Sequence, residues 1–241
     1  MPYQEGYKAE YQQEILAGSE TEEGYQDFYP VTLSVKGEPK VKLWLPLRPF
    51  PDGKEAIALL MTTQLNFKTL EQLSKLLAEN IKDLNPYAVI GIPSLGWQLA
   101  ERVAQELGHP DWVPLTTSRK FWQDADLAQP VTSVTSVQPK TLYLDSYLVS
   151  RLGKGELLVL VDDVACTGGS AAGAYQLLKK LAPKIVDPEK VYLATLLDEG
   201  KEWQSTFEKA GFDWRRRFIR TGHLPIFERS ATGLWVPKQN S

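Results

Sequence analysis

Short apolar runs separated by helical patterns occupy the middle of this 241-residue chain, and this alternation constrains its fold most strongly. The runs contain few polar residues, which is typical of strands buried on both faces of a parallel sheet. Strands in such a sheet are joined by helices that cover it. We therefore predict an α/β core, a mostly parallel sheet flanked by helices, over residues 66–200. The predicted strands are YAVIGI (87–92), WVPL (112–115), TLYLD (141–145), LLVLV (157–161) and VYLATLL (191–197).

Apolar residues at three- and four-residue steps predict the helices between these strands. Thr69, with Gln72 three positions later, matches a capping box, so the first helix is expected to begin there. A second helix ends at Leu107, and Gly108 follows it as a C′ residue. A third helix runs through Leu181. The stripe of the first helix consists of Leu70, Leu73, Leu77, Ile81 and Leu84.

The segments on either side of the core are predicted to be smaller units. Residues 1–27 are polar and rich in glutamate, which suggests an arm. Residues 28–65 alternate apolar and polar positions, which predicts a hairpin that turns near residues 37–39 and a third strand after Pro51–Gly53. We expect a small hood built from these N-terminal strands, from the C-terminal extension at 201–241, or from both.

Composition excludes several kinds of site. Cys166 is the single cysteine, so an intrachain disulfide and a cysteine cage are ruled out, and two histidines are too few for a His-rich metal site. A net charge of −3 gives no general attraction for nucleic acid. No apolar run is long enough to cross a bilayer and no signal pattern is present, so we expect a cytoplasmic protein without membrane contact. The cluster Arg215–Arg217 is a phosphate or nucleic-acid patch, a solvated surface or a subunit contact.

The string VLVDDVACTGGS combines a buried strand, two adjacent carboxylates and a loop of small residues before a helix. Ligands of parallel sheets bind at this end of the strands. The loop and the helix N-terminus suit a phosphate, while Asp162 and Asp163 suit hydroxyl groups or a cation. A sugar phosphate satisfies both requirements. Ser170 stands where a Walker A loop has lysine, and the G-x-G-x-x-G fingerprint is absent. For the Gly-Gly pair alone, a plain tight turn is the alternative.

This string resembles the phosphoribosyl-pyrophosphate (PRPP) motif of type I phosphoribosyltransferases, nearest to the adenine and xanthine branch, and the resemblance extends over residues 56–198. It implies that Asp162 and Asp163 hydrogen-bond the ribose 2′- and 3′-hydroxyls. Cys166 is either a thiol activated by the helix N-terminus or a small residue that fits a tight loop. The resemblance also implies a cradle for the 5′-phosphate made by Ala165, Cys166, Thr167, Gly168, Gly169 and Ser170.

Two further stretches are similar to ligand loops of this family. GIPSLGWQLAERVAQELG resembles the first loop, which implies that Ser94, Leu95 and Gly96 contact pyrophosphate. SRKFW has Arg119 and Lys120 where the family keeps basic residues for pyrophosphate. Without the resemblance, the first stretch is an ordinary strand-to-helix turn and the second is a solvated basic pair.

Residues 121–140 are predicted to form a long loop, in the position of the family's lid over the reacting centre. The loop lacks the Glu-Tyr pair of adenine enzymes, and its Ser- and Thr-rich composition looks more like xanthine enzymes and purine-repressor relatives. The base-binding residues are unknown from the sequence. Aromatic candidates for stacking on the base, each of which is otherwise an ordinary core or surface residue, are Phe28, Tyr29, Phe50 and Trp235.

The resemblance implies an enzyme of purine salvage, a phosphoribosyltransferase that moves the 5-phosphoribosyl group of PRPP to a nitrogenous base, with purines favoured, and releases pyrophosphate. Asp162, Asp163, Arg119 and Lys120 are the implied catalytic residues. Mg²⁺ is the implied cofactor, held mainly by PRPP and also by Asp162 and Asp163. The implied partners are PRPP and a nucleobase-like acceptor, and a homodimer is the candidate assembly.

Two alternatives stay open at this stage. One is a non-catalytic PRPP-binding regulatory protein, and the other is a sugar-phosphate hydrolase or nucleotide-binding module. Residues 1–60 show no helix-turn-helix pattern, which favours the enzyme over a DNA-binding regulator.

Overall fold

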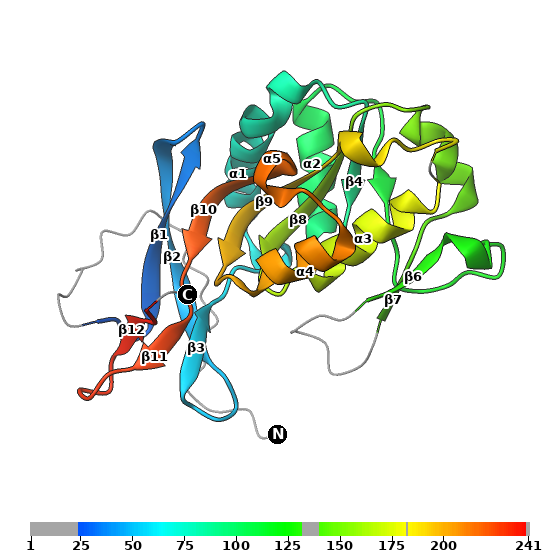
Figure 1. Cartoon of the computed structure of the whole chain (residues 1–241). Helices are drawn as coiled ribbons and strands as arrows, with labels where there is room; N and C mark the ends of the chain where they lie inside the picture. Colours follow the sequence, from blue (N-terminus) through cyan, green and yellow to red (C-terminus); the bar gives the residue numbers. More distant parts are fainter. Residues whose placement is uncertain (1–23, 132–139, 182, 240–241) are drawn as a thin grey trace.

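A five-stranded sheet forms the centre of the computed structural model, which describes residues 24–131, 140–181 and 183–239 (Figure 1). Every neighbouring pair of strands in this core sheet is parallel, which confirms the predicted α/β core. The strand order is β10 (Phe218–Leu224), β9 (Val191–Glu199), β8 (Leu158–Ala165), β4 (Ala88–Gly91) and β5 (Val113–Pro114).

Helices cover both faces of the core sheet. They are α1 (Phe67–Ile81), α2 (Gly96–Glu106), α3 (Gly169–Lys179), α4 (Glu202–Ala210) and the short α5 (Trp214–Arg217). One apolar cluster joins α1 and α2 to Val159 and Val161 of β8, and the other joins α3 and α4 to Leu158 and Leu160 of the same strand. Because successive residues of a strand face opposite ways, the two pairs of helices lie on opposite faces. No helix in the described ranges is long and apolar enough to span a membrane.

The first helix begins before the predicted capping box. Asn66 is the N-cap residue, and its side chain accepts a hydrogen bond of 2.9 Å from the backbone N–H of Thr69. Thr69 is therefore buried inside the first turn, and the predicted start at Thr69 is wrong. The reason is that asparagine supplies the same oxygen acceptor three residues earlier. The end of α2 is as predicted, since Gly108 has a φ of 80° directly after the C-cap residue Leu107.

A second sheet, the hood, stands beside the core sheet and takes strands from both flanking segments (Figure 1). All of its strand pairs are antiparallel. Its first hairpin turns at Lys36 and Gly37, whose φ values of 50° and 87° suit a tight two-residue turn just before the predicted position. The strand order is β1 (Phe28–Val35), β2 (Glu38–Pro49), β3 (Glu55–Ala58), β11 (Phe227–Arg229) and β12 (Trp235–Pro237).

Two parts of the chain lie elsewhere than the sequence suggests. The core sheet does not end near residue 200, because β10 pairs with β9 before the chain enters the hood. The strand predicted at 141–145 is not in the core sheet: β7 (Lys140–Tyr143) pairs antiparallel with β6 (Ala128–Val131). The β6–β7 ribbon occupies part of the predicted lid. Residues 132–139 of that lid and residues 1–23 of the predicted arm lie outside the described residues.

Short 3-10 turns complete the described structure. They are η1 (Thr62–Gln64), η2 (Lys82–Leu84), η3 (Ala125–Leu127), η4 (Ser146–Leu152) and η5 (Pro188–Lys190).

Candidate functional site

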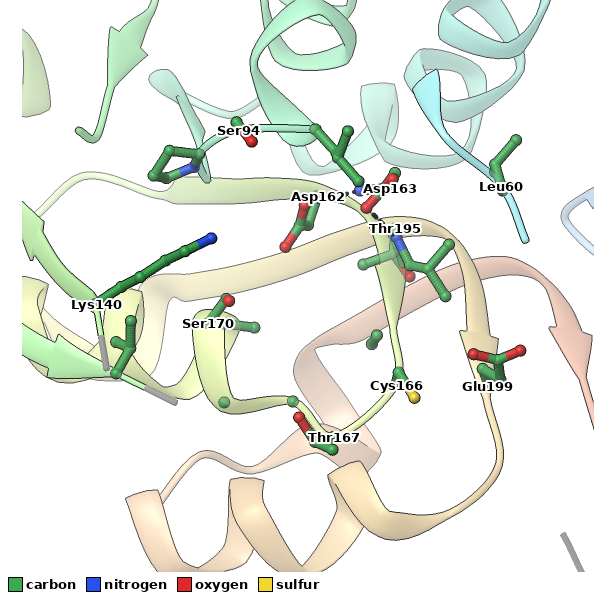
Figure 2. Close-up of a pocket in the computed structure, with 18 of the residues that line it drawn as sticks. Leu60, Ser94, Lys140, Asp162, Asp163, Cys166, Thr167, Ser170, Thr195 and Glu199 are labelled. Atoms are coloured by element: carbon green, nitrogen blue, oxygen red, sulfur yellow. Dashed lines mark hydrogen bonds between the residues drawn. The ribbon is translucent and has the colours of Figure 1, made fainter. Parts of the chain in front are cut away.

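A cavity lies where the hood meets the carboxyl ends of the core strands (Figure 2). Its lining comes from β3 and the residues after it, from the loop after β4, from the β8–α3 connection, from the end of β9 and from the β6–β7 ribbon. The carboxyl edge of a parallel sheet is where ligands bind in such folds. The cavity is therefore the candidate site, and the residues below describe it wall by wall.

The β8–α3 loop lines the cavity with all six residues predicted for a phosphate cradle, from Ala165 to Ser170. Gly168 is the N-cap residue of α3 and has a φ of 75°. A Cβ at this position would lie 2.7 Å from the Phe207 ring and 3.0 Å from the Cβ of Trp203, so glycine is required. The first backbone N–H groups of α3 lack helical partners, and the helix N-terminus carries partial positive charge. This wall can therefore hold an anion.

Asp162 and Asp163 project from β8 beside this loop (Figure 2). Oδ1 of Asp162 accepts a hydrogen bond of 3.0 Å from the backbone N–H of Asp163, and Oδ1 of Asp163 accepts one of 2.7 Å from Val164. Oδ2 of Asp163 is buried and has no hydrogen-bond partner within the described ranges. Burial, and then the Asp163 charge, raise the pKa of Asp162 well above its usual range, and burial raises the pKa of Asp163 to about 6. Buried carboxyl oxygens that can still accept hydrogen bonds suit hydroxyl donors or a cation.

The loop between β4 and α2 forms the next wall. Ser94 and Leu95 line the cavity, and the peptide between Pro93 and Ser94 is cis. Gly96 is the first residue of α2 and lies against β8. A Cβ on Gly96 would lie 2.6 Å from the carbonyl oxygen of Val161 and 3.0 Å from Oδ1 of Asp162. The predicted pyrophosphate loop thus adjoins the Asp pair, and it can do so only with glycine at position 96.

The basic side chain that lines the cavity is not one of the predicted pair. Arg119 and Lys120 are exposed, and Thr117 is the residue of their segment that lines the cavity. Lys140, at the start of β7, lines it, and Figure 2 shows its ammonium group pointing toward Asp162. The sequence does not single out Lys140, because its position depends on the pairing of β6 with β7.

At the far side of the Asp pair lie the buried acid Glu199 and the half-buried thiol of Cys166. Oε1 of Glu199 accepts a hydrogen bond of 3.2 Å from the backbone N–H of Ala58 in the hood, and the thiol of Cys166 lies next to the same carboxyl group. Burial raises the pKa of Glu199 to about 8, and burial together with the Glu199 charge raises the pKa of Cys166 to about 12. Cys166 is therefore a protonated thiol, and the activated-thiol alternative is wrong.

Sequence reasoning missed Glu199, although a signal for it exists. The same rule that selects Asp162, a carboxylate at the carboxyl end of a predicted strand, applies to the end of β9. The rule does not give the order of the strands in the sheet. In the structure β9 is the immediate neighbour of β8, with Asp162 opposite Thr195. Both Thr195 and Glu199 therefore line the cavity.

The aromatic stacking candidates do not line the cavity. Tyr29 makes an edge contact with Phe227 at 4.9 Å between ring centroids, and Trp235 is buried in the hood. Phe28 is exposed and Phe50 is half-buried. The hood instead lines the cavity with the aliphatic side chains and backbone of Ile57, Ala58, Leu59 and Leu60.

Comparisons with known proteins agree with this arrangement. A family model described as "Phosphoribosyl transferase domain" matches residues 62–225. The hypoxanthine/guanine phosphoribosyltransferase of Methanobrevibacter ruminantium is 28% identical over 138 residues, which cover 57% of this chain and 67% of that protein. The adenine phosphoribosyltransferase of Bacteroides fragilis is 27% identical over 164 residues, which cover 66% of this chain and 84% of that protein.

A solved structure has the same fold. The crystal structure of the APRTase from Giardia lamblia complexed with 9-deazaadenine superimposes with a TM-score of 0.58 at 24% sequence identity. The match covers 74% of this chain and 93% of that chain. At this level of identity the likeness concerns the fold alone.

Proposed function

The chain is a member of the phosphoribosyltransferase domain family, enzymes that transfer pentosyl groups, and from this premise we propose that it moves the 5-phosphoribosyl group of PRPP to a purine base and releases pyrophosphate. The observation that carries the proposal is the presence, in one cavity, of the anion cradle at the start of α3 and the carboxyl pair of Asp162 and Asp163. A ribose 5-phosphate needs a phosphate site and a hydroxyl site side by side. The relatives named above are purine enzymes, which supports a purine as the acceptor.

In this proposal each wall of the cavity has one task. The loop from Ala165 to Ser170 holds the 5′-phosphate, and Asp162 and Asp163 accept hydrogen bonds from the ribose hydroxyls. Ser94, Leu95 and Gly96 hold the pyrophosphate through the backbone, and Lys140 adds a positive charge at that end. Arg119 and Lys120 are retained as pyrophosphate ligands because Thr117, which precedes them closely, lines the cavity.

The chemistry that this arrangement favours is electrostatic. As the bond between the ribose and pyrophosphate breaks, positive charge develops on the ring and negative charge on the leaving group. The carboxyl groups of the Asp pair lie on the side of the ribose, while Lys140 and the loop amides lie on the side of the leaving group. Holding both reactants in one cavity also lowers the entropic part of the barrier. No nucleophile in the chain is needed.

The Asp pair fits a divalent cation that arrives with PRPP. Oδ2 of Asp163 is a buried oxygen without a hydrogen-bond partner in the described part of the chain, and Mg²⁺ takes oxygen ligands. The described residues contain no group of three or more His, Cys, Asp or Glu side chains that could hold a metal, so most ligands would come from the oxygens of PRPP. Bound there, Mg²⁺ neutralises charge on the leaving pyrophosphate. A cytoplasmic location and a homodimer belong to the same proposal.

A turnover assay tests the proposed function. The full chain is incubated with Mg²⁺, PRPP and, separately, adenine, hypoxanthine, guanine and xanthine, and both nucleotide and pyrophosphate are quantified. We expect equal amounts of the two products with at least one base. Tight PRPP binding without turnover for any base would identify a PRPP-binding regulator instead. Breakdown of PRPP without an acceptor base would identify a hydrolase.

A further inference from the structure

The two ends of the cavity differ in charge. Lys140 and the Ser94–Leu95 loop lie at one end, and Lys140 is the one basic side chain among the described lining residues. Glu199, Cys166 and the hood residues around Leu60 lie at the other end (Figure 2). A pyrophosphate group carries several negative charges, so it belongs beside Lys140 and not beside a buried carboxyl group. If the proposed function holds, the acceptor base therefore occupies the end of the cavity at Glu199.

Glu199 is an unusual residue for the wall of a base site. It is 4% exposed, and burial is the largest cause of its raised pKa. A buried carboxyl group without a cation is costly unless a partner satisfies it. The Ala58 N–H holds it in place, and neither this hydrogen bond nor the neighbouring Cys166 thiol removes its capacity to accept a further hydrogen bond. Glu199 lines the cavity together with the hood residues Ile57 to Leu60.

We propose that Glu199 selects the acceptor base, through a hydrogen bond that its carboxyl group accepts from an N–H group of the base. The neighbouring wall is aliphatic and offers surface to a flat ring, but no directional contact. The substrate class that fits is a heterocycle with an amino or lactam N–H on the edge that faces β9, as in aminopurines and oxopurines. Glu199 is thus a specificity-determining residue, and the inference rests on the proposed function for the identity of its ligand.

Binding of nucleotides measures this role without requiring turnover. Isothermal titration measures the affinity of the protein for ribose 5-phosphate and for AMP, IMP, GMP and XMP. The affinity for each nucleotide divided by the affinity for ribose 5-phosphate gives the ratio that the base contributes. Glu199→Gln keeps an oxygen for the Ala58 N–H but presents an amide N–H₂ to the base, and Glu199→Leu presents no polar group. In both variants we expect the ratio for the preferred nucleotide to fall at least about tenfold, with ribose 5-phosphate affinity changed less than about twofold.

The number of protons released when a ligand binds is a second measurement of the role of Glu199. An N–H donor favours the ionised carboxyl group, so nucleotide binding near pH 7 should release more protons than ribose 5-phosphate binding does. The titratable groups that face Glu199 are Cys166 and Asp163, and the hood contributes the backbone N–H of Ala58. The phosphate and the Asp pair contribute equally with both ligands, so the difference reports on Glu199. Titrations in buffers of different ionisation enthalpy measure it, and we expect the excess to vanish in Glu199→Gln.

Glu202→Gln is the matched control, because Glu202 is an exposed acid in the first turn of α4 and does not line the cavity. Unchanged ratios in both Glu199 variants would overturn the inference, as would a wild-type protein that binds no nucleotide more tightly than ribose 5-phosphate. Loss of ribose 5-phosphate binding in Glu199→Leu with full rescue in Glu199→Gln would assign Glu199 a structural role instead. If the ratio falls as expected in the Glu199 variants but the wild type shows no turnover, the proposed transfer reaction is contradicted. Glu199 then remains the base-selecting residue.

Discussion

The carboxyl pair at Asp162 and Asp163 is expected to dominate PRPP affinity. Hydrogen bonds to charged groups are worth about 1.5–3 kcal/mol each, so Asp162→Asn with Asp163→Asn should weaken PRPP binding by at least about 100-fold. Titration of each protein with PRPP and Mg²⁺ measures the change. Asp52→Asn, an exposed acid in a hood turn, is the control. Equal PRPP affinity in the double variant and the control would overturn the assignment of the ribose site.

Glu199 should make the stability of the fold depend on pH. Burial raises its pKa from 4.5 to about 8, so between these values the native state keeps a proton that the unfolded chain has lost. The unfolding free energy is therefore expected to fall as the pH rises from about 4.5 to about 8, and Glu199→Gln should remove that part of the slope. Urea denaturation at pH 5.5 and pH 8.5 compares the two proteins. A constant difference in stability at both pH values would contradict this prediction.

At the scale of single elements, the start of α3 needs glycine for two separate reasons. Gly168 and Gly108 have similar φ values of 75° and 80°, but only a Cβ on Gly168 meets a neighbouring ring. Gly108→Ala should cost about 1 kcal/mol from the left-handed backbone alone. Gly168→Ala should cost more, and it should also weaken ribose 5-phosphate binding because the cradle must shift. Thermal unfolding and titration separate the two effects, and equal behaviour of the variants would show that the packing against Phe207 is unimportant.

Lys140 of the β6–β7 ribbon lines the cavity, whereas Lys120 does not. Substitutions of the two lysines should therefore differ in their effect on PRPP binding. Lys140→Ala is expected to raise KM for PRPP roughly tenfold, because a charge at the proposed pyrophosphate end is lost. Lys120→Ala removes the same charge from an exposed position outside the lining and should have a smaller effect. Steady-state kinetics with PRPP as the varied substrate rank them. The reverse order would show that Lys120, and not Lys140, is the main pyrophosphate ligand.

At the scale of the whole molecule, hood and core share one apolar cluster. Leu45 of β2 and Phe227 of β11 belong to the same buried cluster as Leu77 of α1 and Val161 of β8. We therefore expect one cooperative unfolding transition for both sheets. Native-state hydrogen exchange should give peptides from β2 and β8 the same opening free energy. A lower value for the hood peptides would mean that the hood opens alone.

The parts of the fold and site that could be predicted are those that local sequence determines. Asp162 and Gly168 stand in one continuous string, so the strand, the cradle and the helix follow from neighbours in the chain. Glu199 and Lys140 could not be predicted in the same way, because strand order and ribbon pairing bring them to the cavity. The start of α1 was missed for a local reason, since Asn66 and Thr69 are both good caps and the chain uses the earlier one.

The pairing of β3 with β11 also affects how the protein is made. A chain leaves the ribosome from its N-terminus, so β2, one neighbour of β3 in the hood, emerges before it, while the other neighbour, β11, emerges long after it. The wall formed by Ala58 to Leu60 lies against β2, and every described lining residue of the cavity lies at or before the end of β9, whereas β3 gains its partner at Ala56 only after Phe227 is synthesised. A nascent chain therefore contains all of these lining residues before it contains the strands that complete the hood sheet. The hood sheet, and not the set of lining residues, is what translation completes last.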